Sequence, residues 1–507
     1  MRGRRRDRGD AGQSGIRVTV NDVRSNAPWP RFAVVLASAV VTFAVAAGCS
    51  GGSGGSSPGG GSGAPPTSPA TTGPTTSPTQ IPTSAPTNQP TIGPTAAPIN
   101  PALVLPSGFY GETIAAGLSA PRQLVALPNG DLLAGSNDKT NIVYIIPNAE
   151  AKGAAGTPHV FVTLPNGAAQ GIAIDPSHSN LYVATNQSVW RIPYHTGDAT
   201  EPTSAAVEVA QLRRGVVAPN SDGDVHFTSS VAATATTLYV GVGSSCNACV
   251  ESDPTRATIQ QIDLGTLAQS TKAVRFRNAL AVTVNPATGT VWAGGAGQDG
   301  LMPMNGAVVT GVTDPRQAHP YEFFDSVSLH AGVADYGWPV CEENNHLYNP
   351  ANTPGASCTS SVNGAQKDVV PAVVFVAYGT VIGATFYPPA QTGTYVFPSA
   401  YRGGAFVSMH GSWHEDASGR PLSQPDVAYV PMAGDVPSKA VNWNDSTAQW
   451  SSFLYGFQDT STGNRFGRPV GLAVGPQGSL FIADDFAGTI YRIRPGIGPS
   501  SVHRTTR

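Results

Sequence analysis

Apolar and polar residues alternate along this chain in short segments that come in pairs. In each pair, the first segment runs into a turn rich in Pro, Asn or Gly, and the second segment ends in small residues. A period of two is typical of β-strands, and these turn residues provide the conformations, including positive φ, that a tight connection requires. The pattern predicts a β-hairpin that occurs six times, with copies beginning near Arg122, Gly171, Ser230, Asn278, Gly383 and Arg468.

The spacing of the copies predicts how the hairpins pack. Hairpins that recur every ~40–60 residues, without helical segments between them, can bury their faces only against their neighbours around a ring. We therefore expect an all-β fold, a six-bladed β-propeller. Residues 108–118, ahead of the first copy, also alternate, and we expect them to close the ring by pairing with the last blade. The long gaps after the fourth and fifth copies indicate outer strands with insertions.

The first 49 residues are predicted to be an export signal. Residues 1–31 carry eight Arg and three Asp, and apolar or small residues follow from Phe32 to Gly48. The segment ends in Val45-Ala-Ala-Gly-Cys49, which resembles a bacterial lipobox, so Cys49 is a candidate for lipidation. A plain signal peptide or an uncleaved anchor is the alternative. If Cys49 is lipidated, the protein is a cell-surface or membrane-anchored lipoprotein that meets the membrane only through its lipid. Otherwise it is secreted.

The following segment, residues 50–104, is predicted to be a disordered linker. From Ser50 to about Pro98 it consists almost wholly of Gly, Ser, Pro and Thr, with too few apolar side chains to offset the entropy of ordering. The propeller is then expected over residues 105–496, with a disordered tail at 497–507. Without the export signal the chain keeps 21 Lys and Arg against 29 Asp and Glu, which indicates no basic surface for nucleic acid.

Four cysteines lie beyond Cys49, and an even number in an exported protein predicts disulfides. We pair Cys341 with Cys358 because both fall in one insertion rich in Gly, Asn and Pro, which has little core of its own. Cys246 and Cys249 then form the second candidate pair. A zinc site built from the four cysteines is the competing interpretation, which export disfavours.

Candidate chemistry lies where polar side chains precede an inner strand, because propellers place function on the loops at the mouth of the central channel. His226 precedes the third hairpin, Arg277-Asn278 opens the fourth and Arg468 opens the sixth. An exposed loop position is the alternative for His226, and a surface charge is the alternative for Arg277. At a strand start that points into a channel, Arg277 suits the binding of an anion or oxyanion.

Five segments carry a resemblance to a known family. In order, they are His226 with Leu238–Pro254, then Arg277-Asn278, Asp335-Tyr-Gly-Trp-Pro339, Tyr401–Trp413 with its His-Gly-Ser-Trp, and Gly467-Arg-Pro-Val-Gly471. Over about residues 108–495 this order closely resembles the soluble pyrroloquinoline quinone (PQQ)-dependent sugar dehydrogenases, specifically their sorbosone dehydrogenase-like branch. That family is a six-bladed propeller, in agreement with the hairpin count.

The resemblance implies an activity, a cofactor and roles for individual residues. A histidine base takes a proton from a sugar hydroxyl or a hydrated aldehyde while hydride passes to PQQ, and an external acceptor then takes the electrons. His226 resembles the base, and Arg277 and Asn278 resemble the pair that contacts the quinone oxygens. The remaining positions implied are Gly297 and Gln298 as carbonyl ligands of calcium, Arg468 as a ligand of a cofactor carboxylate, and His410 and Trp413 as residues lining the channel.

Departures from the family pattern keep other functions open. Residues 294–300 lack the acidic or Asn residue that often precedes the key glycine of the calcium loop, and the residues after His226 are untypical. A non-catalytic cell-surface propeller that binds carbohydrate or protein is therefore the alternative to a dehydrogenase. A calcium-dependent lactone hydrolase fits less well, because few acidic residues precede the inner strands.

Overall fold

The structure is a computed structural model, and it describes residues 96–137, 140–213, 226–299, 320–341, 369–416 and 419–496. The predicted export signal with Cys49, most of the predicted linker and the tail 497–507 lie outside the described residues. Strands dominate the described part, in which the helical elements are two short 3₁₀ turns, η3 (Val327–Leu329) and η4 (Ser399–Tyr401). The described residues include no helix that is both long and apolar enough to cross a membrane.

Six antiparallel sheets follow one another along the chain, each beginning with a predicted hairpin. The first three sheets in chain order are β3 (Pro121–Ala126), β4 (Leu132–Ser136), β5 (Ile142–Ile146) and β6 (His159–Thr163), then β7 (Gly171–Ile174), β8 (Asn180–Ala184), β9 (Ser188–Pro193) and β10 (Val207–Gln211), then β11 (Val231–Ala233), β12 (Thr237–Val242), β13 (Thr258–Asp263) and β14 (Gln269–Val274), with β18 (Ala334–Asp335) added in parallel to β14.

The remaining sheets hold the insertions that the long gaps indicate. They are β15 (Ala279–Val284), β16 (Val291–Gly295), β17 (Glu322–Asp325) and β19 (Val373–Phe375), then β20 (Val381–Phe386), β21 (Ala405–Met409), β22 (Asp426–Val430) and β25 (Ser451–Leu454), with the small ribbon of β23 (Met432–Ala433) and β24 (Val436–Pro437), and finally β26 (Pro469–Val474), β27 (Leu480–Asp484) and β28 (Thr489–Pro495), which are joined by β2 (Phe109–Ala115) and β1 (Ala97–Pro98).

The first strands of the six sheets form a closed ring. β3, β7, β11, β15, β20 and β26 each contact the next strand in this order, and β26 contacts β3. The prediction of an all-β, six-bladed propeller is confirmed. Apolar side chains from the alternating positions fill the space between neighbouring blades, as Leu133 and Ile145 of the first blade do against Ile172 and Val183 of the second. Burying each such side chain stabilises the fold by about 1.5–3 kcal/mol.

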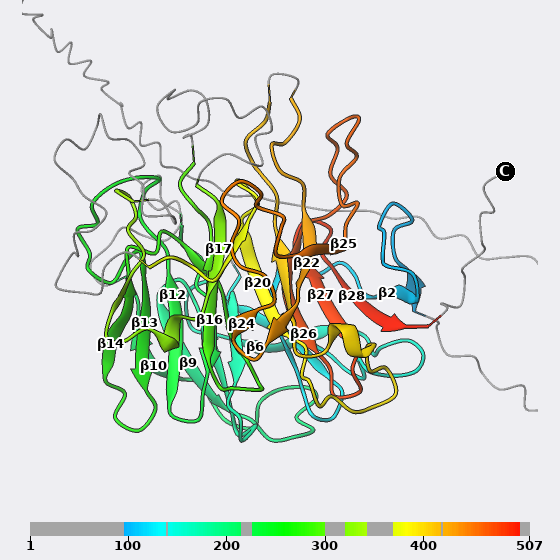
Figure 1. Cartoon of the computed structure of the whole chain (residues 1–507). Helices are drawn as coiled ribbons and strands as arrows, with labels where there is room; N and C mark the ends of the chain where they lie inside the picture. Colours follow the sequence, from blue (N-terminus) through cyan, green and yellow to red (C-terminus); the bar gives the residue numbers. More distant parts are fainter. Residues whose placement is uncertain are drawn as a thin grey trace, which may run out of the picture. The chain divides into compact units, whose positions relative to one another are not determined.

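The ring closes as expected, by the pairing of the chain's first long strand with its last. β2 runs antiparallel to β28, with Phe109 opposite Pro495 and Glu112 opposite Arg492, and Figure 1 shows blue β2 beside red β28. Glu112 is buried and accepts hydrogen bonds at 3.1 and 2.8 Å from the guanidinium of Arg492. Pairing begins before residue 105, because β1 adds to β2 and Leu103 is buried.

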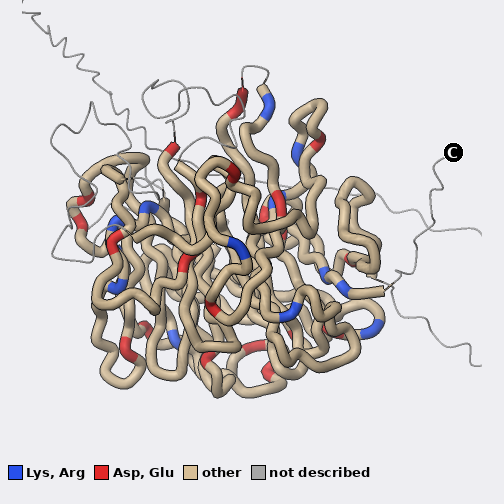
Figure 2. Tube along the Cα trace, in the orientation of Figure 1, with Lys and Arg blue, Asp and Glu red and all other residues tan. Residues whose placement is uncertain are grey.

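Small residues on the inner strands let the blades approach one another closely. A side chain at Gly383 would collide with the carbonyl oxygen of Val470, and one at Gly471 would collide with that of Arg122. Neighbouring inner strands therefore meet backbone to backbone at these points, which only glycine allows. Charges are spread thinly over the described trace, and Figure 2 shows Lys and Arg interspersed with Asp and Glu.

Candidate active site at one mouth of the channel

The loops that lead into the inner strands surround a cavity of about 420 Å³. All six inner strands start at this mouth of the ring, so the residues just before them converge, although they are far apart in the sequence. Five of the predicted site residues line this one cavity: His226, Arg277, Asn278, His410 and Trp413. Its lining also includes the side chains of Arg122, Asp299, Tyr378, Thr380 and His414.

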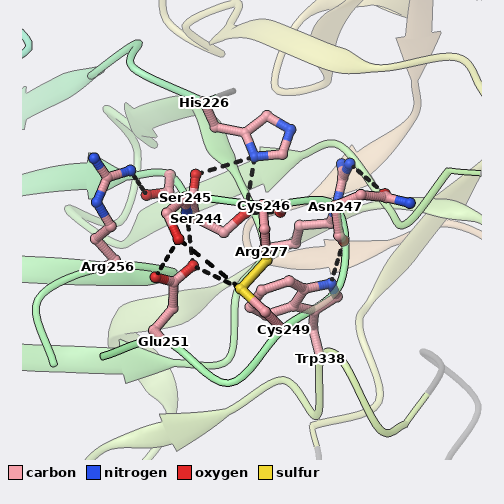
Figure 3. The surroundings of a disulfide bond; sticks show 11 residues. His226, Ser244, Ser245, Cys246, Asn247, Cys249, Glu251, Arg256, Arg277 and Trp338 are labelled. Carbon is pink, nitrogen blue, oxygen red and sulfur yellow. Dashed lines mark hydrogen bonds between the residues drawn. A yellow bond between two sulfur atoms is a disulfide. The ribbon is translucent and has the colours of Figure 1, made fainter. Parts of the chain in front are cut away.

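Hydrogen bonds fix the tautomer of His226. Its Nδ1 lies 2.8 Å from the hydroxyl oxygen of Ser244 and 3.2 Å from the Ser244 carbonyl oxygen. The Ser244 hydroxyl already donates its proton to the carbonyl of Cys246 at 2.8 Å, so it can only accept from the imidazole. Nδ1 therefore carries the proton, and the lone pair is on Nε2, which points away from Ser244 (Figure 3).

The surroundings also keep His226 neutral. Burial lowers the pKa of His226 to about 3, and the positive charges of Arg277, Arg256 and Arg213 lower it as well. The ordinary pKa of histidine is about 6.5, so the imidazole is uncharged throughout the physiological range. A neutral imidazole with a free Nε2 is the form that a general base requires.

Arg277 is buried beside His226, and acceptors of the protein surround its guanidinium. Nε donates to the carbonyl of Asn247 at 3.0 Å, and the terminal nitrogens donate to Asn247 Oδ1 at 2.8 Å and Gly297 O at 2.5 Å. One terminal nitrogen also contacts the carboxylate of Asp299 at 3.2 Å, and the other lies 3.4 Å from Ala296 O. A ligand that binds directly to this guanidinium must therefore displace an acceptor, and half-exposed Asp299 is the one best able to move.

Asn278, the next residue, is buried, and its Oδ1 has no partner among the described residues. A buried amide oxygen without a donor is costly in a folded protein, at about 1–3 kcal/mol. Asn278 is one of the residues that line the cavity, whereas its Oδ1 atom itself is buried beside Gly243.

His410 belongs to a buried charged network that joins three blades. Its Nε2 donates to Asp485 at 2.9 Å, and Arg122 contacts the same carboxylate at 3.4 Å. Burial by itself raises the pKa of Asp485, but His410 and Arg122 outweigh this effect and hold the pKa well below its usual range. Burial lowers the pKa of His410 to about 4, although Asp485 opposes this shift, so His410 is the second neutral imidazole in the cavity.

Arg468 does not line the cavity but supports the residues that do. It is buried and donates to the carbonyls of His410 at 2.7 Å and Gly411 at 2.6 Å. Its guanidinium lies 3.9 Å from the ring centre of Trp413, whose side chain is 73% exposed at the rim. Trp413 is thus an exposed aromatic surface held in place from below.

Gly297 and Gln298 lie in the loop after β16, beside the cavity rather than in its lining. The carbonyl of Gly297 accepts from Arg277, and its N–H donates to the buried carboxylate of Glu322 at 2.6 Å. The side-chain oxygen of Gln298 is buried without a described partner. Burial, together with the negative charge of Asp299, raises the pKa of Glu322 to about 8, so this carboxyl is largely protonated at neutral pH.

The floor of the cavity closes the channel. Leu280, Ile382 and Val470 of three inner strands form an apolar cluster there. Below the cavity, Gln123 reaches across the channel, donating to the carbonyl of Val231 at 2.8 Å and accepting from its N–H at 3.1 Å. Among the described residues, these groups separate the cavity from the other end of the channel.

Comparison with known proteins assigns the family. The model of the TrAA12-like family matches residues 103–496. The chain belongs to the TrAA12-like family. It is also similar to an uncharacterized protein of Borreliella burgdorferi, with 22% identity over 405 residues that cover 78% of this chain and 91% of that protein.

Solved structures similar to this TrAA12-like chain share its fold. The PQQ domain of pyranose dehydrogenase from Coprinopsis cinerea, in its holo form, has a TM-score of 0.58 at 19% identity and covers 77% of this chain and 97% of its own. The calcium structure of Trichoderma reesei Carbohydrate-Active Enzymes Family AA12 has a TM-score of 0.57 at 19% identity and covers 80% and 99%. At this identity the likeness concerns the fold alone.

Sequence reasoning missed several residues of the TrAA12-like site. Arg122 had the same signal as Arg277 and Arg468, a cation at the start of an inner strand, and the sequence analysis did not single it out. Asp485, Asp299 and Glu322 follow strands or lie inside one, where the signal of a polar residue just before an inner strand does not apply. Tyr378 and Thr380 have left-handed φ values of 61° and 56°, and such strained backbone is frequent at functional sites.

The structure also shows the bonding state of three cysteines beyond Cys49. Cys246 and Cys249 form a disulfide beside His226, so in this structure they are not thiolate ligands of zinc. Cys341 is disulfide-bonded as well, and Cys358, its predicted partner, lies outside the described residues.

Proposed function

We propose that this chain is an oxidoreductase that oxidises a sugar or a sugar-derived aldehyde with PQQ as hydride acceptor, and that an external acceptor then takes the electrons. Membership of the TrAA12-like family and the shared fold with the PQQ domain of a pyranose dehydrogenase support the proposal. The observation that carries it is the placement of His226, a neutral imidazole with a free Nε2, beside Arg277 in one cavity.

The residues present fit PQQ, an aromatic tricarboxylate. The cavity of about 420 Å³ is in the usual range for sites of small molecules and cofactors. Arg122 and Arg277 offer positive charge to carboxylates, and Asn278 lines the cavity beside Arg277. Trp413 adds an aromatic surface at the rim. When bound, PQQ supplies an electrophilic carbonyl carbon that accepts a hydride.

The protein's own part in the reaction is to move a proton and to stabilise charge. Nε2 of His226 takes the proton of the substrate hydroxyl, which helps the carbon to lose its hydride. Ser244 keeps Nδ1 protonated, so the base presents its lone pair in one fixed direction. The buried charge of Arg277 stabilises the negative charge that develops beside it in the cavity, because its guanidinium is shielded from bulk water.

Calcium does not fit at Gly297 and Gln298 in the described arrangement. The carbonyl oxygen of Gly297 already accepts from a guanidinium at 2.5 Å, and a second cation on the same oxygen would be repelled. We therefore assign no step of the reaction to calcium. The narrower assignment to the sorbosone dehydrogenase-like branch and the identity of the sugar also stay predictions.

One observation favours the alternative, a non-catalytic propeller that binds carbohydrate. The guanidinium of Arg277 is surrounded by protein acceptors, whereas the most exposed group of the site is the indole of Trp413, a typical surface for stacking a sugar ring. In either case we propose that the protein is exported, on a lipid at Cys49 or secreted, as its first 49 residues predict.

Titration of the purified protein with PQQ, followed by absorbance and by reduction of a dye with aldoses and aldehydes, tests the proposal. We expect saturable binding and dye reduction that needs both PQQ and substrate. Saturable carbohydrate binding without any binding of PQQ would establish the alternative instead.

A further inference from the structure

A short disulfide-closed loop between β12 and β13 touches both central residues of the cavity. The loop comprises Ser244–Glu251, with the disulfide between Cys246 and Cys249 at its tip, and it lies beside His226 and Arg277 (Figure 3). Neither cysteine lines the cavity. The disulfide therefore contacts no ligand directly, and any role in the site must pass through the residues that it holds.

The first arm of the loop, Ser244–Cys246, determines which nitrogen of His226 carries the proton. The hydroxyl of Ser244 accepts from Nδ1 of His226 only because its own proton is committed to the carbonyl of Cys246. If that carbonyl turned away, the hydroxyl could rotate and donate to the imidazole, and only the more distant carbonyl of Ser244, at 3.2 Å, would still hold the proton on Nδ1. The form with the proton on Nε2 would then gain population, and in that form the imidazole presents a proton instead of a lone pair to the cavity.

The second arm, Asn247, orients the guanidinium of Arg277. The carbonyl of Asn247 accepts from Nε of Arg277 at 3.0 Å and from Nε1 of Trp338 at 3.1 Å, while its Oδ1 accepts from Arg277 at 2.8 Å. The same side chain pairs with the backbone of Asp299, accepting from its N–H at 3.0 Å and donating to its carbonyl at 2.9 Å. One residue thus joins the loop of the third blade to the loop of the fourth.

Three contacts hold the loop in this shape. Asn247 and Ala248, the two residues between the cysteines, are both exposed, so the bonds of Asn247 to Arg277 and Asp299 depend on the conformation of an exposed turn. The disulfide closes that turn and packs against the buried indole of Trp338. Glu251 braces the other end, accepting from the N–H of Ser245 at 2.6 Å and from its hydroxyl at 2.9 Å.

We propose that the loop Ser244–Glu251 is the positioning element of this site, in which the Cys246–Cys249 disulfide holds Ser244 against His226 and Asn247 against Arg277. Ser244 sets which nitrogen of His226 carries the proton. Asn247 sets the orientation of the guanidinium. The proposal rests on the function proposed above for the roles of His226 and Arg277, but the geometry that it predicts exists without any ligand.

¹⁵N NMR of the histidine side chains in the ligand-free protein tests the first arm. The signal of His226 is assigned by its loss in His226→Gln. We expect the Nδ1–H tautomer in the wild type, and a mixture with more Nε2–H in Ser244→Ala and in the double variant Cys246→Ser, Cys249→Ser. Ser136→Ala removes an equally buried hydroxyl of the first blade and should change nothing. An unchanged tautomer in folded Ser244→Ala, which keeps the disulfide, would overturn the proposal even if the double variant fails to fold.

Binding of PQQ tests the second arm. Asn247→Ala should leave the His226 tautomer as it is and raise the Kd for PQQ about three- to tenfold, the range of one ordinary hydrogen bond, because Asn247 acts on PQQ only through Arg277. An Asn247→Ala protein that binds PQQ as the wild type does would overturn this arm. If the wild type itself binds no PQQ, the proposed function fails, whereas the tautomer comparison still decides whether the loop positions His226.

Discussion

The two mouths of the central channel are built from the same six strands but differ in the side chains that line them. At the mouth where the inner strands begin, imidazoles, guanidinium groups, a carboxylate and an indole line a cavity of about 420 Å³. At the mouth where they end, the described lining of a hollow of about 240 Å³ is mainly Val, Ala, Ile, Leu and Thr, and none of it is charged. Gln123 separates the two.

The difference shows how a propeller separates stability from function. The apolar mouth continues the alternating pattern of the strands, and its side chains pack for stability. The polar mouth carries residues that precede the strands or follow them, where a change of side chain does not disturb the sheet. Substitutions at the two mouths should therefore have different consequences.

The largest difference is expected for the base. His226→Gln removes the Nε2 lone pair and should lower kcat by ~10²–10⁴-fold, the usual effect of losing a general base, with the Kd for PQQ nearly unchanged. Thr283→Ala at the apolar mouth is the matched control and should leave kcat as it is. Equal activity of His226→Gln and Thr283→Ala in steady-state dye reduction would remove His226 from the mechanism.

A smaller effect is expected for Arg468, which supports the cavity from behind. Arg468→Ala loses the bonds to two carbonyls and the contact with Trp413, so the rim should loosen and the Kd for PQQ should rise about tenfold, equivalent to ~1.4 kcal/mol. The kcat at saturating PQQ should fall less. Arg402→Ala also loses a bond to a backbone carbonyl, but that carbonyl belongs to Phe397, which does not line the cavity, so this variant should bind PQQ normally.

The titration of His226 tests the electrostatics of the polar mouth. The pKa of His226 is lowered to about 3, first by burial and then by Arg277, so the ligand-free protein should show a neutral imidazole by NMR at pH 5, where an ordinary histidine is mostly protonated. Arg277→Gln removes a like charge and should raise this pKa. A His226 that titrates near pH 6.5 in the wild type would show that water reaches the imidazole freely.

The pH dependence of stability should also depend on the polar mouth. The pKa of Glu322 is raised, mainly by burial, from 4.5 to about 8 in the folded protein, so the stability that its protonated form contributes is complete below pH 4.5 and is lost as the pH rises through 8. Glu322→Gln keeps the shape without the charge and should unfold at a higher temperature than the wild type at pH 9, but not at pH 4. Parallel melting curves of the two proteins across this range would contradict the assignment.

The smallest effect is expected from removing calcium. Because the carbonyl of Gly297 is bonded to Arg277, the Kd for PQQ should be the same after exhaustive treatment with EDTA and after calcium is restored. Elemental analysis provides the control for metal content. A Kd that falls sharply with calcium would show that Arg277 leaves Gly297 when the ion binds.

The sequence by itself determined the architecture, because strand alternation and turn residues are local signals. The six hairpins and the closing strand at 108–118 follow from them, and so does the prominence of His226, Arg277 and Asn278, which stand just before inner strands. Since every inner strand starts at the same mouth, position along the chain was enough to bring these three residues to one cavity.

Only the tertiary structure decided how these residues act. Arg122 and Asp485 lie at opposite ends of the propeller sequence and meet because β2 closes the ring onto β28. The donors of Arg277 are occupied by loops of two blades, which no local pattern reveals. The charge states of His226 and Glu322 depend on burial and on charges that neighbouring loops bring near. Local sequence specifies the strands, whereas contacts between distant loops exist only once the ring has closed.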